Sequence, residues 1–282
     1  MESGITLYDT ADVYGLGRAE NLLGKAIKFF EKKSEKLVIS TKGGVAWDSL
    51  GRTRRDSSAK YLKQAVRGSL KRLRIESIPL YFLHWTDGVT PLQESLCALQ
   101  ELSLQGYIQA IGVSNIAPAD LNLIPKGSIS ALQIKGNLLE PDELIRYQKV
   151  ARRWSVPIIS YSSLADGLLS GTIPSNKKYG ANDHRSRYPL FQDKAKTIVK
   201  KRIILLKAIA KSLHKSPAQY ALRWLLDTNL ASGVLFGAKN PRQAGENLGA
   251  LGWTIPKKKI LVGCQIVYRK SSKVHRFLST TP

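Results

Sequence analysis

Short apolar segments alternate with amphipathic segments along almost the whole chain. The apolar segments have the length and β-branched content of buried strands. They cover residues 5–9, 37–42, 78–84, 108–113, 131–135, 156–161 and 233–236. Between them, apolar residues recur at helical spacing, as Leu62, Val66, Leu70 and Leu73 do within residues 57–73. This alternation predicts a parallel sheet with helical crossovers.

The remaining amphipathic segments complete this α/β pattern. Helices are expected over a segment containing residues 20–27 and over 91–104, 117–124, 141–154, 197–213, 217–226 and 241–251. A polar segment, 173–192, is expected to be a loop. The pattern indicates a (β/α)8 TIM-type barrel, but a closed barrel needs eight strands and the first is missing from the pattern. We expect the barrel to span residues 1–252, and residues 253–282 to form a basic, atypical C-terminal tail.

The composition narrows the class of protein. The chain has 282 residues, of which 43% are hydrophobic, enough for a sizeable core. It has neither a stretch long and apolar enough for a membrane span nor a signal-peptide pattern, so we expect a cytoplasmic protein with no membrane partner. Organellar import stays open if the N-terminus is incomplete. Cys97 and Cys264 lie in no metal-binding motif, and the four histidines show no ligand spacing, so no metal is expected.

The net charge of +23 raises the question of a nucleic-acid partner. The 44 basic residues are spread along the chain rather than gathered in a recognition motif. We therefore expect no specific nucleic-acid partner, and an anionic substrate, an anionic cofactor or solubility explains the charge. Nothing in the sequence indicates the oligomeric state.

Polar residues at the ends of the expected strands suggest a chemistry. Asp9, Lys42 and His84 end three successive strands, and Tyr14 follows the first. In α/β barrels these strand ends hold the reactive groups. An ammonium held by a carboxylate favours ionisation of a nearby phenol, so Tyr14 could protonate a carbonyl oxygen while a cofactor supplies hydride. Each residue taken alone also has a structural explanation. Asp9 could cap the following turn or helix, and Tyr14 could be an aromatic residue of a pocket wall. Lys42 could be a solvated charge at a strand end, and His84 a hydrogen-bonded histidine of the core.

The same residues carry a resemblance to a known family. The segment from Asp9 to Gly15 resembles the D-T-A-x-x-Y-G signature of the aldo-keto reductase superfamily. Further matching segments, in register over about residues 4–252, are 20–24, 39–43, 83–85, 99–106, 111–115, 161–164 and 237–247. One departure is Ser163, where the family has proline in a Y-S-P-L turn.

The resemblance implies a role for each matching residue. Asp9, Tyr14, Lys42 and His84 would form a catalytic tetrad. The implied cofactor-binding residues are Ser114, Asn115 and Gln133 at the nicotinamide carboxamide, Tyr161 at the nicotinamide ring, and Gly237, Lys239, Arg242, Gln243, Glu246 and Asn247 at the adenosine end. Ser162 and Leu164 are also implied to bind the cofactor. Two residues at the adenosine end, Lys239 and Arg242, are placed to bind a 2′-phosphate, which favours NADP(H), unless they are only surface charges.

The expected function is NADPH-dependent reduction of aldehydes or ketones to alcohols, with a small carbonyl compound as substrate. One alternative is a cofactor-binding regulatory subunit resembling the potassium-channel β-subunits. Another is an incomplete, inactive reductase, because the first strand is missing and the tail after Trp253 departs from the family.

Overall fold

The structure is a computed structural model that describes residues 5–29, 37–174 and 177–267. It divides into two compact units. The first unit comprises residues 1–133 and 149–157, and the second comprises residues 134–148 and 158–282. Strand β7 (Ala131–Lys135) and helix α5 (Asp142–Trp154) each run from one unit into the other.

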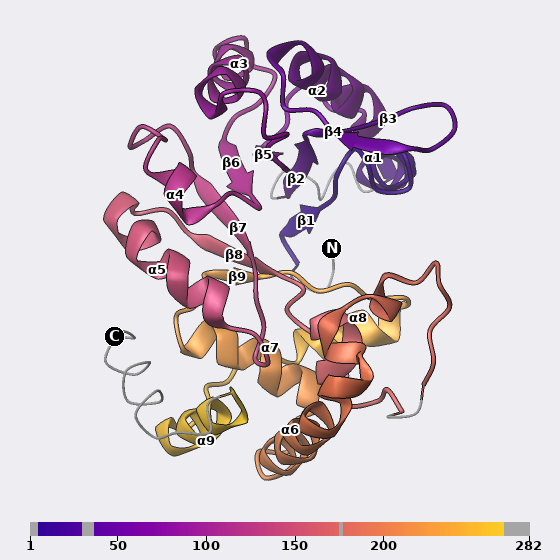
Figure 1. The fold of residues 1–282 in the computed structure, drawn as a ribbon, viewed down its shortest axis with the longest axis vertical. Coiled ribbons are helices and arrows are strands. Elements are labelled where there is room, and N and C mark those ends of the chain that lie inside the picture. Colours follow the sequence, from indigo (N-terminus) through magenta and orange to yellow (C-terminus); the bar gives the residue numbers. More distant parts are fainter. Residues whose placement is uncertain (1–4, 30–36, 175–176, 268–282) are drawn as a thin grey trace. The chain divides into compact units, whose positions relative to one another are not determined.

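The first unit is built on parallel strands (Figure 1). Their order in the sheet is β1 (Leu7–Asp9), β2 (Val38–Gly43), β5 (Leu80–Leu83), β6 (Ile111–Ser114) and the start of β7. The crossover helices are α1 (Arg18–Phe29), α2 (Ala59–Leu73), α3 (Leu92–Leu104) and the short α4 (Pro118–Leu121). The register places Asp9 beside Ser40, and Lys42 beside Phe82.

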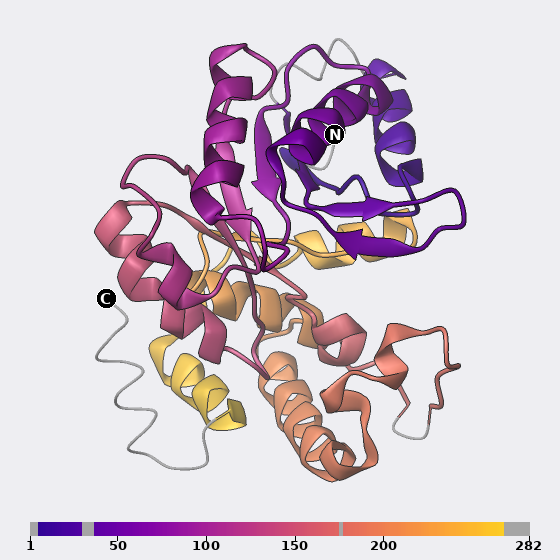
Figure 2. The same ribbon diagram turned by 45° about the horizontal axis from the view of Figure 1, so that its top comes forward.

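Helix α2 shows why these crossovers form where the pattern predicts. Its apolar face is buried along Leu62, Val66 and Leu73, at helical spacing. At its start the Ser58 side chain accepts a hydrogen bond from the Tyr61 amide at 3.3 Å, and at its end Arg74 takes a left-handed conformation, with φ 59°. The helix packs against α1 on one side and α3 on the other, as Figures 1 and 2 show.

A small antiparallel hairpin, which the sequence pattern did not predict, follows β2. It consists of β3 (Val45–Trp47) and β4 (Thr53–Arg55). Each strand has three residues, and β4 is exposed throughout. Such short strands leave almost no alternation of apolar and polar residues to detect.

The second unit contains the end of β7 and the parallel neighbours β8 (Ile158–Tyr161) and β9 (Gly233–Val234). Two 3₁₀ turns, η3 (His184–Ser186) and η4 (Pro189–Phe191), lie within the segment 173–192 that was expected to be a loop, and a third, η2 (Ala165–Ser170), precedes it. The helices are α6 (Asp193–Lys211), α7 (Pro217–Asp227), α8 (Pro241–Leu248) and α9 (Lys257–Val267). A capping box between Ser216 and Gln219 starts α7, which buries Trp224 completely.

The described part of the tail is helix α9. It packs against α6, beside which it lies in Figure 2. The Tyr220 hydroxyl donates to the Lys259 carbonyl at 2.8 Å, and Arg202 donates to the Val267 carbonyl at 3.0 Å. The division between barrel and tail at residue 252 stays a prediction, and residues 268–282 lie outside the described residues.

The predicted α/β class is confirmed, since parallel strands alternate with helices as in (β/α)8 barrels of the TIM type. Seven strands of the main sheet lie within the described residues. No helix in the described ranges is long and apolar enough to cross a membrane.

Candidate active site

A buried ion pair joins the first two strands of the sheet. Lys42 is 1% exposed, and its Nζ donates to Asp9 Oδ2 at 2.5 Å and to the Thr10 carbonyl at 2.6 Å. Ser40 and Lys42 are two residues apart on β2, so both side chains point to the same face of the sheet. Ser40 Oγ accordingly donates to Asp9 Oδ1 at 2.6 Å. Burial lowers the pKa of Lys42, and the neighbouring Asp9 carboxylate opposes that shift.

Tyr14 lies beside this ammonium. It belongs to the turn between β1 and α1, where its amide donates to the Ala11 carbonyl at 3.1 Å. Its ring is 43% exposed, and Lys42 Nζ lies 5.2 Å from the ring centroid. The His84 ring meets the Tyr14 ring edge-on, with 5.9 Å between centroids. The tetrad residues expected from the sequence are therefore neighbours in the first unit.

His84 is a neutral group at this site. It follows β5, is 8% exposed, and its amide donates to the Gly43 carbonyl at 2.8 Å. Burial, helped by the charge of Lys42, lowers the pKa of His84 to about 3. A neutral imidazole has one donor and one acceptor nitrogen. Its buried Nδ1 has no hydrogen-bond partner among the described residues.

Three amide and hydroxyl side chains adjoin the tetrad. Gln133 Nε2 donates to Asp9 Oδ1 at 2.9 Å. Asn115 Nδ2 donates to the His84 carbonyl at 3.0 Å and to Ser114 Oγ at 3.1 Å. Asn115 has φ 51°, a left-handed conformation that asparagine tolerates better than most residues. The sheet therefore brings the expected carboxamide-binding residues and the tetrad to one edge of the first unit.

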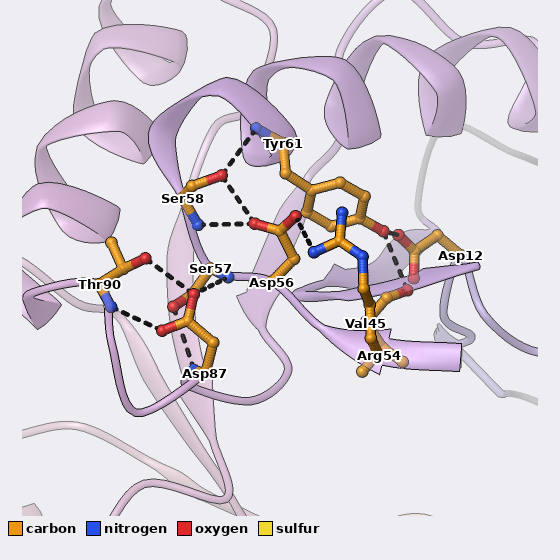
Figure 3. A network of polar contacts seen from close by, with 9 residues as sticks. All are labelled: Asp12, Val45, Arg54, Asp56, Ser57, Ser58, Tyr61, Asp87 and Thr90. Carbon is orange, nitrogen blue, oxygen red and sulfur yellow. Dashed lines mark hydrogen bonds and ion pairs between the residues drawn. The ribbon is translucent and has the colours of Figure 1, made fainter. Parts of the chain in front are cut away.

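A second polar cluster, which sequence reasoning missed, joins Asp12, Tyr61 and Val45 (Figure 3). The Tyr61 hydroxyl lies 3.0 Å from Asp12 Oδ2 and 2.9 Å from the Val45 carbonyl oxygen. A phenol has one proton, so it cannot donate to both acceptors. A protonated Asp12 that donates to Tyr61 would satisfy both contacts. Burial, as the largest cause, raises the pKa of Asp12 to about 7, which agrees with this assignment.

The opposite face of β2 holds another buried ion pair. Arg72 Nε lies 2.6 Å from Glu20 Oε2, and Thr41 Oγ1 donates to Glu20 Oε1 at 2.6 Å. Glu20 is fully buried, whereas Arg72 is 22% exposed. This pair links α1, α2 and β2. The sequence contained one indication of this ion pair, because Glu20 is a charged residue on the apolar face of α1.

The expected cofactor residues of the second unit form two groups. In the first group, Tyr161 ends β8, and burial raises its pKa to about 12. Ser162 follows with φ 52°, and its carbonyl accepts from Asn137 Nδ2 at 3.2 Å. Leu164 precedes the first turn of η2. Ser163, which replaces the family's proline, is buried and lies 3.1 Å, Oγ to Oγ, from Ser160.

The second group surrounds the start of α8. Asn240 caps the helix by accepting from the Gln243 amide at 2.9 Å, and Gln243 Oε1 accepts from the Lys239 amide at 2.8 Å. Lys239 and Arg242 are exposed there. The other expected members are the exposed Gly237 and Glu246, and the buried Asn247. The start of a helix, with two cations beside it, suits an anionic group.

The described residues contain no cluster of three or more His, Cys, Asp or Glu side chains that could hold a metal ion. The donors at the edge of the first unit are instead an ammonium, a phenol, an imidazole and two side-chain amides. Such groups bind and protonate an oxygen atom and orient an amide. An α/β fold with these donors at the ends of its strands suits an enzyme that acts on an oxygen atom.

The chain belongs to the Aldo/keto reductase family, whose family model matches residues 1–261. It is 32% identical over 257 residues to aldo-keto reductase YhdN of Bacillus subtilis, an alignment that covers 90% of this chain and 77% of the relative. It is 28% identical over 261 residues to the NADH-specific methylglyoxal reductase of Escherichia coli, covering 88% and 79%.

Among solved structures, the glycerol dehydrogenase AKR11B4 from Gluconobacter oxydans matches with a TM-score of 0.82 at 29% identity. The match covers 99% of this chain and 83% of that chain. Reductases and a dehydrogenase thus stand among the relatives, which indicates an oxidoreductase.

Proposed function

We propose that this chain is an aldo-keto reductase that reduces an aldehyde or ketone to an alcohol with NADP(H), and that Tyr14 is the general acid. The observation that carries the proposal is the placement of Lys42 Nζ. It is held 2.5 Å from Asp9 Oδ2 and lies 5.2 Å from the centroid of the half-exposed Tyr14 ring. A buried ammonium group therefore lies next to a phenol ring that solvent and substrate can reach.

The residues of the first unit fit a nicotinamide. Its carboxamide needs hydrogen-bond donors and acceptors, which Ser114 and Asn115 supply at the end of β6 and Gln133 supplies from the neighbouring β7. The partnerless buried Nδ1 of His84 marks a polar position in the same cluster. When bound, a reduced nicotinamide supplies hydride to a carbonyl carbon.

Side chains of the first unit supply the proton that the substrate oxygen takes up. Tyr14 donates its hydroxyl proton to the substrate oxygen, and the Lys42 ammonium stabilises the phenolate that remains. Asp9 holds the ammonium in position. The neutral His84 ring can donate a hydrogen bond to the same oxygen without competing as an acid, because its pKa is about 3. Tyr14 and His84 therefore act on the substrate oxygen itself, whereas Lys42 and Asp9 act through Tyr14.

The preference for NADP(H) is part of the proposal. The exposed Lys239 and Arg242 at the start of α8 support it, since cations at a helix start bind phosphate. The relative from Escherichia coli is NADH-specific, so membership of the family does not by itself set the choice between NADPH and NADH. The resemblance to the family supports Tyr161, Ser162 and Leu164 of the second unit as further cofactor-binding residues.

The test follows NADPH absorbance with an aromatic aldehyde as substrate. Tyr14→Phe is expected to lower kcat by about a hundredfold to ten-thousandfold, because it removes the acid but leaves the ring. Tyr107→Phe, a change of the same chemistry outside the site, serves as the matched control and should leave kcat unchanged. Undiminished turnover in Tyr14→Phe would reject the proposed acid. Tight NADPH binding with negligible turnover by the unmodified protein would instead favour a regulatory subunit.

A further inference from the structure

The second unit contains a cavity of about 330 Å³ that none of the proposed active-site residues line. It lies between the segment that follows η2 and one face of α6. Its apolar wall includes Ile173, Phe191, Val199 and Ile203. Val199 is 6% exposed, so it forms part of the packed floor. A volume near 300 Å³ is at the lower end of the range that holds small organic ligands.

The charged residues around this apolar wall are all lysines. Lys177, Lys196, Lys200 and Lys207 line the cavity, and among the described residues no aspartate or glutamate does. Three of these lysines share the face of α6 that also carries Val199 and Ile203, since residues three or four positions apart lie on one face. Helix α6 has 19 residues and contains a single acid, Asp193.

The carboxylates that the structure describes leave most of this positive charge unpaired. Lys196 pairs with the exposed Asp193, at 2.6 Å between Nζ and Oδ1. Within the described part of the chain, no carboxylate lies within ion-pair distance of Lys177, Lys200 or Lys207. Neighbouring like charges destabilise a helix, so an anion at the cavity would relieve repulsion. The apolar wall would at the same time bury the uncharged part of such a ligand.

We propose that this cavity binds a small amphipathic anion, with an apolar body against Phe191, Val199 and Ile203 and a carboxylate among the lysines. Neither feature suffices alone. A neutral apolar compound leaves the lysines unpaired, and an inorganic anion leaves the apolar wall open to water. A medium-chain carboxylate supplies both parts.

Isothermal titration of the full chain with decanoate tests the site, with decanol as the uncharged comparison. Lys200→Glu/Lys207→Glu should weaken decanoate binding by at least about tenfold, because it replaces attraction with repulsion. Lys194→Glu/Lys201→Glu is the matched control. It makes the same change of charge on the same helix, at positions that do not line the cavity. Decanol should bind more weakly than decanoate to the unmodified protein.

A second variant tests the apolar wall. Ile203→Trp places a larger side chain in the cavity and should weaken decanoate binding without reversing any charge. Thermal melting of each variant shows that the chain still folds. No decanoate binding, equal losses in the two double variants, or equal affinity for decanol would each overturn the proposal. Displacement of decanoate by NADPH would also overturn it, by placing the ligand at the cofactor site.

Discussion

The charged candidate residues of the two units differ in their burial and in their bonding. In the first unit the charged groups are buried and bonded to one another, as Lys42 is to Asp9 at 1% exposure. In the second unit Lys239 and Arg242 stand exposed at a helix start. Buried charges need fixed partners to offset desolvation, so the first set is held in place before any ligand arrives. Changes in the first unit should therefore alter chemistry and stability, and changes in the second should alter affinity alone.

The largest effect is expected for Lys42→Met, which removes the ammonium behind Tyr14. We expect kcat to fall by about a thousandfold, since the phenolate formed by proton donation loses its stabilising charge. The assay is NADPH oxidation with an aromatic aldehyde. Lys63→Met is the control, because Lys63 pairs with Glu101 at the surface and is 42% exposed. A loss below fivefold for Lys42→Met would contradict the role given to this lysine.

The next effect should appear in stability. Arg72→Met leaves the fully buried Glu20 without its ionic partner. Breaking one side of a buried pair costs about 3 kcal/mol, so the free energy of unfolding in urea should fall by about that much. Breaking the surface pair with Glu101→Gln should cost under about 1 kcal/mol. Equal losses of unfolding free energy in the two variants would show that the buried ion pair contributes no more to stability than the surface pair.

A smaller, pH-dependent effect is expected at Asp12. Its pKa is about 7 in the folded chain, against an ordinary value of 3.8, so the folded state prefers the protonated carboxyl. The unfolded chain loses this proton first as pH rises. Asp12 therefore begins to oppose folding near pH 4, and its cost reaches its full value above pH 7.

Asp12→Asn keeps a donor toward the Tyr61 hydroxyl and removes the ionisation. The free energy of unfolding of the variant should exceed that of the unmodified chain by a margin that grows with pH. Between pH 5 and pH 8 this margin should increase by about 2 kcal/mol. Urea unfolding at several pH values, plotted as the difference between the two proteins, cancels most contributions of other groups. A difference that stays flat with pH would mean that Asp12 is ionised in the folded chain.

The smallest effect should come from the second unit. Arg242→Ala should weaken NADPH binding by about tenfold and leave NADH binding unchanged, since only NADPH carries the 2′-phosphate. Fluorescence titration with both cofactors measures this, and the melting temperature should not change. Lys211→Ala, an exposed lysine elsewhere in the unit, is the control. Equal weakening of both cofactors would assign Arg242 another role than phosphate recognition.

The sequence predicted the strands well where they were apolar and buried. The expected strand 131–135 coincides with β7, and the other expected strands end within two residues of the observed ones. It missed the hairpin β3–β4, whose three-residue strands carry almost no periodic signal. It also missed α9, whose packing depends on Gly263. A side chain there would collide with the Tyr220 hydroxyl and the Trp224 ring, and neither neighbour can be inferred from local sequence.

By itself, the sequence determined the alternation of strands and helices and placed Asp9, Tyr14, Lys42 and His84 near strand ends. It did so because side-chain periodicity within a segment, and the succession of segments along the chain, can be read directly from the sequence. Only the tertiary structure decided the partners: Gln133 reaching Asp9 across 124 positions, Tyr61 reaching Asp12, and Arg72 reaching Glu20. Such pairings form when packing excludes water and buried polar groups must find one another, and no window of sequence contains both members.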